Sequence, residues 1–126
     1  MTALQGLRGG LIVSVQAWPG SAIDDPYVIA AMAAAAAANG AAGVRIQGVA
    51  NLLAVRARVN CLMIGIIKRQ YDEFEPYITP TVEEVYEVVQ SGAEIVAFDA
   101  TERLRPGGTT VEGLVDAIHR AGRLAM

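Results

Sequence analysis

Apolar runs of strand length recur along the chain, at residues 11–16, 42–48, 61–68 and 94–100. Each run is followed by a segment with helical spacing or helix-end signals, so two kinds of element alternate. The first long helix is predicted to begin after Asp25, with Pro26 in its first position, and to end near Gly40. Thr81 and Glu84 have the spacing of a capping box and predict the start of a later helix.

The predicted order is therefore strand then helix, four times over, with residues 123–126 opening a fifth strand. Strands that are apolar on both faces and alternate with helices are typical of a parallel sheet covered by helices. Two α/β architectures have this pattern, a doubly wound sheet and a (β/α)₈ barrel. A whole barrel needs about 250 residues, so this chain of 126 residues would supply a half-barrel.

Composition narrows the class of protein and of partner. Hydrophobic residues make up 53% of the chain, which favours a folded domain over disorder. The net charge of −3 provides no basic surface for nucleic acid, and no run approaches the roughly 20 apolar residues of a membrane span. The single cysteine, Cys61, cannot form an internal disulfide, which favours a reducing, cytoplasmic setting. We predict one domain over residues 1–126 that binds neither nucleic acid nor a membrane.

Each apolar run brings polar side chains to its C-terminal end: Gln16, Arg45 with Gln47, Lys68 and Asp99. In parallel α/β folds the carboxyl ends of the strands lie on one face, where ligands bind. For any one of these residues, the simpler interpretation is a strand that becomes polar as it leaves the core. Lys68 and Arg45 weaken that interpretation, because their charges interrupt apolar strands.

An amine at such a site has two chemical uses. Lysine amines are charged at neutral pH, and both burial and a nearby cation disfavour the charged form. Arg45, on the strand next to that of Lys68, is expected to contribute to this effect. Proton abstraction beside a carbonyl and Schiff-base formation are then both open to Lys68.

Five blocks of the sequence resemble successive blocks of bacterial N-acylmannosamine-6-phosphate 2-epimerases: "GGLIVSVQAWPG", "GVRIQGV", "IGIIKRQYDEFEPYITPT", "DATERLRPGG" and "DAIHRAGRLAM". The blocks are collinear from about residue 6 to the last residue. The resemblance implies a (β/α)₈ barrel in sialic-acid and aminosugar catabolism. It also implies interconversion of N-acetylmannosamine 6-phosphate and N-acetylglucosamine 6-phosphate, with no cofactor and no metal.

The resemblance also implies roles for individual residues. Lys68 matches the lysine that removes and returns the C2 proton of the ring-opened sugar. Gln16 and Arg45 match substrate contacts on the first two strands, and Asp99 matches an acid at the end of the fourth. Val15 stands where the family commonly has a cysteine.

Family members continue beyond the point where this sequence stops, with an aspartate on the fifth strand, a glutamate that assists the lysine, and phosphate-binding loops. We therefore expect weak or no turnover from this chain alone. A half-barrel leaves two open sheet edges, so we also expect copies to pair edge to edge as a homo-oligomer. Two alternatives stay open: an inactive half-barrel that oligomerises or binds sugar phosphate, and a Schiff-base aldolase.

Other residues with reactive or recognition chemistry have more ordinary interpretations. His119 is expected on a helix surface or in packing, and Cys61 as a small core residue. Trp18 follows the first strand and either lines the mouth of the site or covers the core. Arg103 and Arg105 follow the fourth strand, where they either attract an anionic sugar phosphate or stabilise their own loop.

Overall fold

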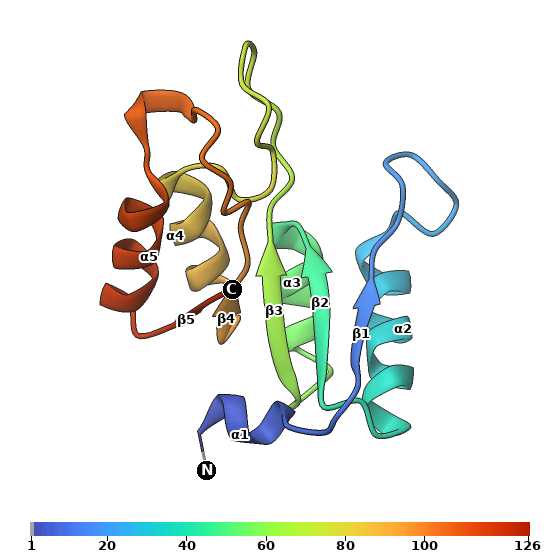
Figure 1. The fold of residues 1–126 in the computed structure, drawn as a ribbon. Helices are drawn as coiled ribbons and strands as arrows, with labels where there is room; N and C mark the ends of the chain where they lie inside the picture. Colours follow the sequence, from blue (N-terminus) through green and yellow to red (C-terminus); the bar gives the residue numbers. More distant parts are fainter. Residues whose placement is uncertain (1) are drawn as a thin grey trace.

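The computed structural model describes residues 2–126 and contains one parallel sheet of five strands (Figure 1). The strands are β1 (Ile12–Val15), β2 (Gly43–Gln47), β3 (Leu62–Ile66), β4 (Ile95–Val96) and β5 (Leu124–Ala125). They lie in the order β1-β2-β3-β4-β5, and every neighbouring pair is parallel. A doubly wound sheet reverses its strand order part-way, so this order excludes that alternative. The predicted half-barrel is confirmed: four βα units and the start of a fifth strand.

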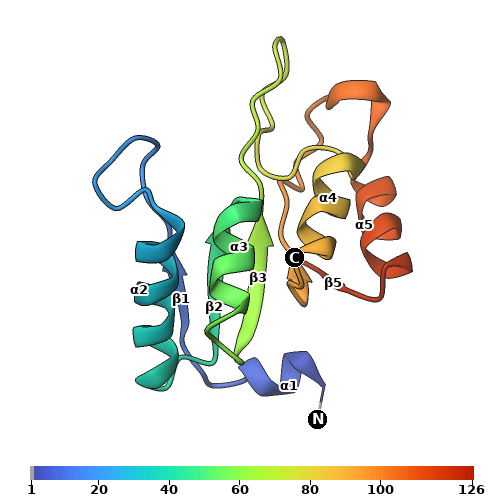
Figure 2. The same cartoon turned by 180° about the vertical axis from the view of Figure 1, so that it is seen from behind.

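The main helices cover one face of this sheet, as the view from behind shows (Figure 2). They are α2 (Pro26–Ala38), α3 (Val49–Arg56), α4 (Val82–Gln90) and α5 (Val111–Arg120). We call the opposite face of the sheet the inner face. Within residues 2–126, no helix is both long and apolar enough to cross a membrane.

The predicted helix starts are found in the structure. Asp25 precedes α2, and its Oδ1 accepts hydrogen bonds from the backbone N–H groups of Tyr27 at 2.8 Å and Val28 at 3.3 Å. Thr81 and Glu84 form the capping box at the start of α4. These bonds satisfy N–H groups that have no partner inside the helix.

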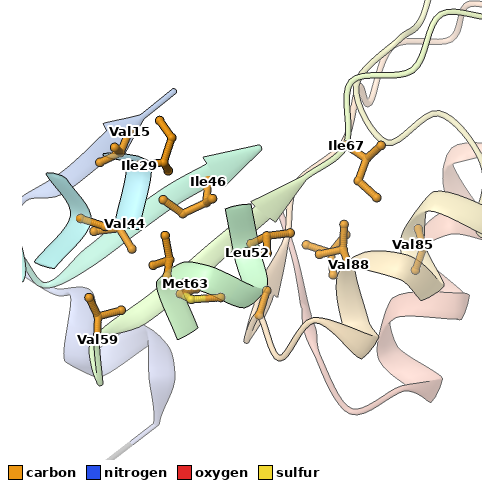
Figure 3. Close-up of a cluster of buried hydrophobic side chains, with 14 of the residues drawn as sticks. Val15, Ile29, Val44, Ile46, Leu52, Val59, Met63, Ile67, Val85 and Val88 are labelled. Carbon is orange, nitrogen blue, oxygen red and sulfur yellow. The ribbon is translucent and has the colours of Figure 1, made fainter. Parts of the chain in front are cut away.

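The main core lies between the sheet and its covering helices (Figure 3). Strand residues such as Ile46 and Met63 meet helix residues such as Leu52 and Val88 in one buried cluster. Gly65 in β3 permits the close approach of α4, because a Cβ atom there would lie 2.5 Å from Cγ1 of Val88. The predicted apolar strands are buried in β2, β3 and β4, whereas Leu11 and Ile12 at the start of the first apolar run are exposed, because β1 is an edge strand.

A second, smaller cluster occupies the inner face of the sheet. It contains Ile64, Ile66, Ile95 and Ala97, with Leu7, Ile78 and Leu124 packed against them. Leu7 belongs to α1 (Ala3–Leu7), a short helix beside the amino ends of the strands (Figure 1). The helix α1 was not predicted, because five residues are too few to show helical periodicity.

All four predicted strands are shorter in the structure, and for β3 and β4 the reason is a hairpin that follows β3. Residues 67–79 leave the sheet and return, and Lys68 pairs with Ile78 in an antiparallel bridge. The returning arm then lies beside β4, where the backbone N–H of Asp99 donates to the carbonyl of Ile78 at 3.0 Å. The parallel pairing of β3 and β4 stops at this insertion.

Candidate active site

Alternation along the strands places the predicted polar residues on the inner face. Successive strand residues point to opposite faces, and Val15 and Ile46 belong to the core under the helices. Gln16 and Arg45, their neighbours in the sequence, therefore lie on the inner side. Arg45 pairs in register with Ile64, which belongs to the inner-face cluster.

A cleft of about 360 Å³ opens at the carboxyl edge of the first three strands. Its walls are Gln16, Ala17, Trp18, Pro19, Gln47, Lys68 and Tyr77. Three different segments contribute: the chain after β1, the end of β2, and the hairpin after β3. The structure thus brings together Lys68 and Gln16, two predicted site residues, with Gln47, a polar residue at the end of β2.

Lys68 lies just beyond β3, where paired backbone groups fix the base of the hairpin. Thr79 donates its backbone N–H to the carbonyl of Ile67 at 2.7 Å, and its Oγ1 accepts from the N–H of Ile67 at 3.2 Å. Thr79 is fully buried and has a φ of 46°, a left-handed conformation that is uncommon for a β-branched residue. Strain of this kind gathers at functional sites, where the surrounding structure holds it in place.

The residue after Lys68 anchors the hairpin to α4. Arg69 pairs with Glu84 at 3.0 Å and with Glu87 at 3.1 Å, and the hydroxyl of Tyr71 donates to Glu84. Although burial opposes ionisation, hydrogen bonds from Thr81, Tyr71 and Arg69 hold the pKa of Glu84 below its usual value. Arg69 is thus held on the helix side, while its neighbour Lys68 lines the cleft.

The amine of Lys68 has a different electrostatic environment from the one predicted. Lys68 is exposed, and in residues 2–126 it makes no ion pair. Arg45 is not among the residues that line its cleft. Two features were expected to surround the amine of Lys68: burial and the charge of Arg45. The structure shows neither, since Lys68 is exposed and Arg45 does not line its cleft.

Unsatisfied polar atoms mark the inner face near the cleft. Gln16 donates from Nε2 to Oγ of Ser14 at 2.9 Å, but its buried Oε1 has no hydrogen-bond partner among residues 2–126. The buried Nε of Arg45, deeper in the sheet, likewise has none within the described residues. An unmet buried hydrogen-bonding group costs about 1–3 kcal/mol, so these two atoms are hydrogen-bonding groups that residues 2–126 do not use.

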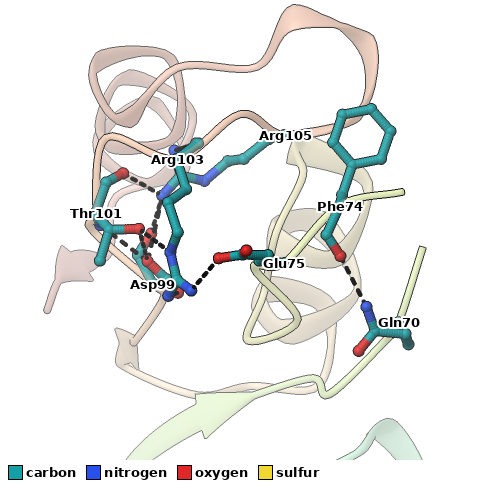
Figure 4. A network of polar contacts seen from close by, with 7 residues as sticks. All are labelled: Gln70, Phe74, Glu75, Asp99, Thr101, Arg103 and Arg105. Atoms are coloured by element: carbon teal, nitrogen blue, oxygen red, sulfur yellow. Dashed lines mark hydrogen bonds and ion pairs between the residues drawn. The ribbon is translucent and has the colours of Figure 1, made fainter. Parts of the chain in front are cut away.

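Asp99 lies outside the cleft, although its strand ends at the same edge. The returning arm of the hairpin, at Ile78, occupies the place between β3 and Asp99. The Asp99 carboxylate pairs with Arg103 at 3.0 Å and accepts from the N–H of Thr101 at 2.9 Å (Figure 4). Despite partial burial, these bonds and the nearby guanidinium charges lower the pKa of Asp99.

The structure distinguishes between the two roles considered for the arginines after β4. Arg105 is only 4% exposed and donates to the carbonyls of Asp99, Thr101 and Arg103. Arg103 also reaches across to Glu75 of the hairpin at 2.8 Å. Both side chains therefore stabilise the loop, and Arg103 also connects it to the hairpin.

The remaining candidates occupy ordinary positions. His119 is exposed on α5, and Cys61 is a half-buried free cysteine before β3. In the part of the chain that the structure describes, no three His, Cys, Asp or Glu side chains are grouped to hold a metal ion. Trp18 lines the mouth of the cleft, the first of its two predicted positions.

Comparisons with known proteins agree with this geometry. A family model, NanE, described as "Putative N-acetylmannosamine-6-phosphate epimerase", matches residues 29–126. The chain belongs to this family. The resemblance found in the five sequence blocks is thereby confirmed, and the family is one of isomerases.

Individual relatives give the same result. Proteins named "Putative N-acetylmannosamine-6-phosphate 2-epimerase" from Photobacterium profundum and Edwardsiella ictaluri are 48% and 53% identical to this chain. The matches cover 98% and 94% of this chain, but 52% and 50% of the relatives. The chain therefore spans about half the length of the curated relatives it matches.

A solved structure shares the fold. It is the N-acetylmannosamine-6-phosphate 2-epimerase from Clostridium perfringens, which is 44% identical to this chain, with a TM-score of 0.96. The match covers 100% of this chain and 55% of the Clostridium chain. The half-barrel described above is thus the arrangement of the corresponding half of a full-length family member.

Proposed function

We propose that this chain carries the proton-transfer base of an N-acetylmannosamine-6-phosphate 2-epimerase, and that Lys68 is that base. The observation that carries the proposal is the position of Lys68, which is the single lysine of the sequence. Lys68 lies in a cleft at the carboxyl edge of the sheet, beside two glutamine amides, and has no ion-pair partner in the part of the chain that the structure describes. Membership of the epimerase family supports the same assignment.

The proposed reaction inverts C2 of the ring-opened sugar phosphate. Lys68 Nζ, in its uncharged form, takes the proton from C2, and the C–H electrons form a C1–C2 double bond as the carbonyl oxygen becomes negative. Return of the proton to the opposite face of C2 completes the epimerisation. Gln16 and Arg45 serve as substrate contacts, and the positive charge of Arg45 favours the negative intermediate. Asp99 is proposed as a secondary substrate contact outside the Lys68 cleft, with a smaller effect than Lys68, because the returning arm of the hairpin separates the two residues and Arg103 pairs with its carboxylate.

We further propose that the 126-residue chain alone has weak or no turnover. Lys68 is exposed, so water solvates the amine that the reaction needs desolvated.

Residues 1–126 act as one domain, the N-terminal half of a barrel, in the cytoplasm. Because β1 and β5 are edge strands of the described sheet, copies of the chain pair through these edges as a homo-oligomer. Sedimentation as a monomer at tens of micromolar would contradict the pairing.

Solvent deuterium exchange at C2 of N-acetylmannosamine 6-phosphate tests the assignment. The exchange is measured by NMR for two proteins. One is the 126-residue chain. The other, called the joined protein, is a chimera in which this chain is followed by the part of the Clostridium perfringens relative that the match does not cover. We expect exchange in the joined protein, and a fall of at least about 100-fold in Lys68→Ala. Arg120→Ala, which removes an exposed cation from α5, is the matched control and should exchange normally. If the joined protein folds and binds the sugar phosphate but shows no deuterium exchange at C2, the assignment of Lys68 as the proton-transfer base is wrong.

The single lysine also separates the epimerase from the Schiff-base aldolase. Borohydride reduction in the presence of the sugar phosphate would fix any imine as a stable adduct on Lys68, visible by peptide mass spectrometry. We expect no adduct, because proton transfer forms no covalent bond to the amine. A reduced sugar on Lys68 would favour the aldolase.

A further inference from the structure

One wall of the Lys68 cleft is apolar and exposed. Trp18 is 85% exposed and Tyr77 is 45% exposed, and both line the cleft together with Pro19. An aromatic side chain that leaves water buries about 150–250 Å² of surface, and this burial lowers the free energy of the folded protein. Trp18 forgoes this gain in the described chain, since it belongs to neither buried cluster.

The position of Trp18 is set by its loop. The N–H of Ser21 donates to the carbonyl of Trp18 at 3.0 Å, which closes a turn, and the N–H of Gly20 donates to Oδ2 of Asp24 at 2.7 Å. On the other side, the N–H of Arg69 donates to the carbonyl of Tyr77 at 2.8 Å. Both aromatic residues are therefore carried by hydrogen-bonded backbone.

The cleft thus has polar groups on its floor and an apolar rim. Gln16, Gln47 and Lys68 come from the strand ends, and Trp18 and Tyr77 from the segments beyond them. A ligand that satisfies both parts has hydrogen-bonding groups at one end and a small apolar group at the other. Such a division is typical of sites where a few polar groups orient a ligand against apolar walls.

The chemistry of the proposed reaction identifies which part of the substrate meets the rim. The proton that Lys68 takes is on C2, and the acylamido substituent is bonded to that same carbon. The acyl methyl, the one apolar group of the sugar phosphate, therefore lies a few bonds from the amine. The apolar side chains that share the cleft with Lys68 are those of the rim.

We propose that Trp18 and Tyr77 form an acyl-binding subsite, which selects 2-acylamido sugar phosphates over sugar phosphates that lack the acyl group. This inference rests on the proposed function. It gives a role to Trp18, which is not one of the polar residues at the strand ends. It also gives a physical cause for the expected selectivity of the cleft. In this subsite the acyl methyl leaves water and packs on the aromatic faces, while the amide of the same acylamido group hydrogen-bonds to Gln16 and Gln47.

Binding experiments on the 126-residue chain test the subsite without requiring turnover. The probes are N-acetylmannosamine 6-phosphate and mannose 6-phosphate, followed by saturation-transfer NMR. In the wild type we expect the acetyl methyl protons to receive the strongest saturation. The acylated sugar should bind about fivefold to tenfold more tightly than mannose 6-phosphate. Emission of Trp18, the single tryptophan, should shift to shorter wavelength with the acylated sugar alone.

Variants separate the subsite from the catalytic assignment. Trp18→Ala should lose the preference for the acylated sugar and leave mannose 6-phosphate binding within about twofold. Tyr86→Ala, which removes an exposed aromatic from α4, is the matched control and should keep the preference. Equal binding of both sugars, with no effect of Trp18→Ala but weakening by Lys68→Ala, would overturn the subsite and leave the proposed function standing. Absence of binding by either sugar would overturn both.

Discussion

The cleft at Lys68 and the cluster at Asp99 lie at the same edge of the sheet but differ in charge balance. Asp99 is surrounded by donors and cations: Thr101, Arg103 and Arg105 all contact its carboxylate or its backbone. Lys68 has no ion pair in residues 2–126, and the other side chains that line its cleft are uncharged. A charge whose partners are supplied by the fold stabilises a loop, whereas a charge without a partner is available to a substrate.

The hairpin of residues 67–79 produces this difference. Its first arm carries Lys68 into the cleft, and its second arm separates that cleft from Asp99. Ion pairs secure it on two sides, from Arg69 to Glu84 and from Glu75 to Arg103. The hairpin is therefore ion-paired both to α4 and to the loop that holds Asp99, although Asp99 does not line the Lys68 cleft.

The largest expected contrast between the two regions is in catalysis. Lys68→Ala should reduce C2 exchange in the joined protein at least about 100-fold and leave its unfolding free energy within about 0.5 kcal/mol. Asp99→Asn should do the reverse, lowering stability by about 1 kcal/mol with less than a tenfold effect on exchange. NMR exchange and urea unfolding measure the two quantities. Equal losses of exchange in both variants would place Asp99 within the reacting site.

The next effect concerns the anchor of the hairpin. Glu84→Gln keeps the shape of a fully buried side chain but removes the charge that Arg69 and Tyr71 contact. We expect a loss of about 2 kcal/mol in unfolding free energy, measured by urea denaturation. Glu83→Gln, on the exposed side of the same helix turn, should change it by no more than about 0.5 kcal/mol. A small effect at Glu84 would mean that the hairpin is held without this network.

The smallest expected effect is the pH dependence of stability. The pKa values of Glu84 and Asp99 are lowered in the folded chain, so the unfolded chain binds protons at a higher pH than the folded one. Their contribution is fully present above their ordinary values, near pH 4, and is lost as the pH falls below them. Unfolding free energies at pH 7, 5, 4 and 3 should therefore decline, and less steeply in Asp99→Asn. An unchanged slope would contradict the assigned role of the Arg103 and Arg105 charges.

Much of the fold was predictable because its signals are local. The apolar runs and the caps at Asp25 and Thr81 depend on neighbouring residues alone, and the structure confirms them. Strand order was not decided locally, since two architectures share the same alternation. The short helix α1 and the return of the hairpin beside Lys68 also escaped prediction, because the partners that hold them are far away in the sequence.

The candidate site divides in the same way. The sequence placed Gln16 and Lys68 at strand ends of one face, and the structure brings them into one cleft. It did not anticipate that Gln47 would line this cleft in place of Arg45, nor that Tyr77 would complete its rim. The signal for Gln47 was its spacing of two residues from Arg45, which gives both side chains the same face.

By itself the sequence determined the alternation of strands and helices, the family, and the presence of a lysine at the end of an apolar strand. These follow from periodicity and motif, which are properties of residues close along the chain. Only the tertiary structure decided that Asp99 is neutralised by its own loop while Lys68 has no counter-charge within residues 2–126. The reason is physical: a charge becomes balanced or available according to which distant side chains the fold brings within hydrogen-bonding distance.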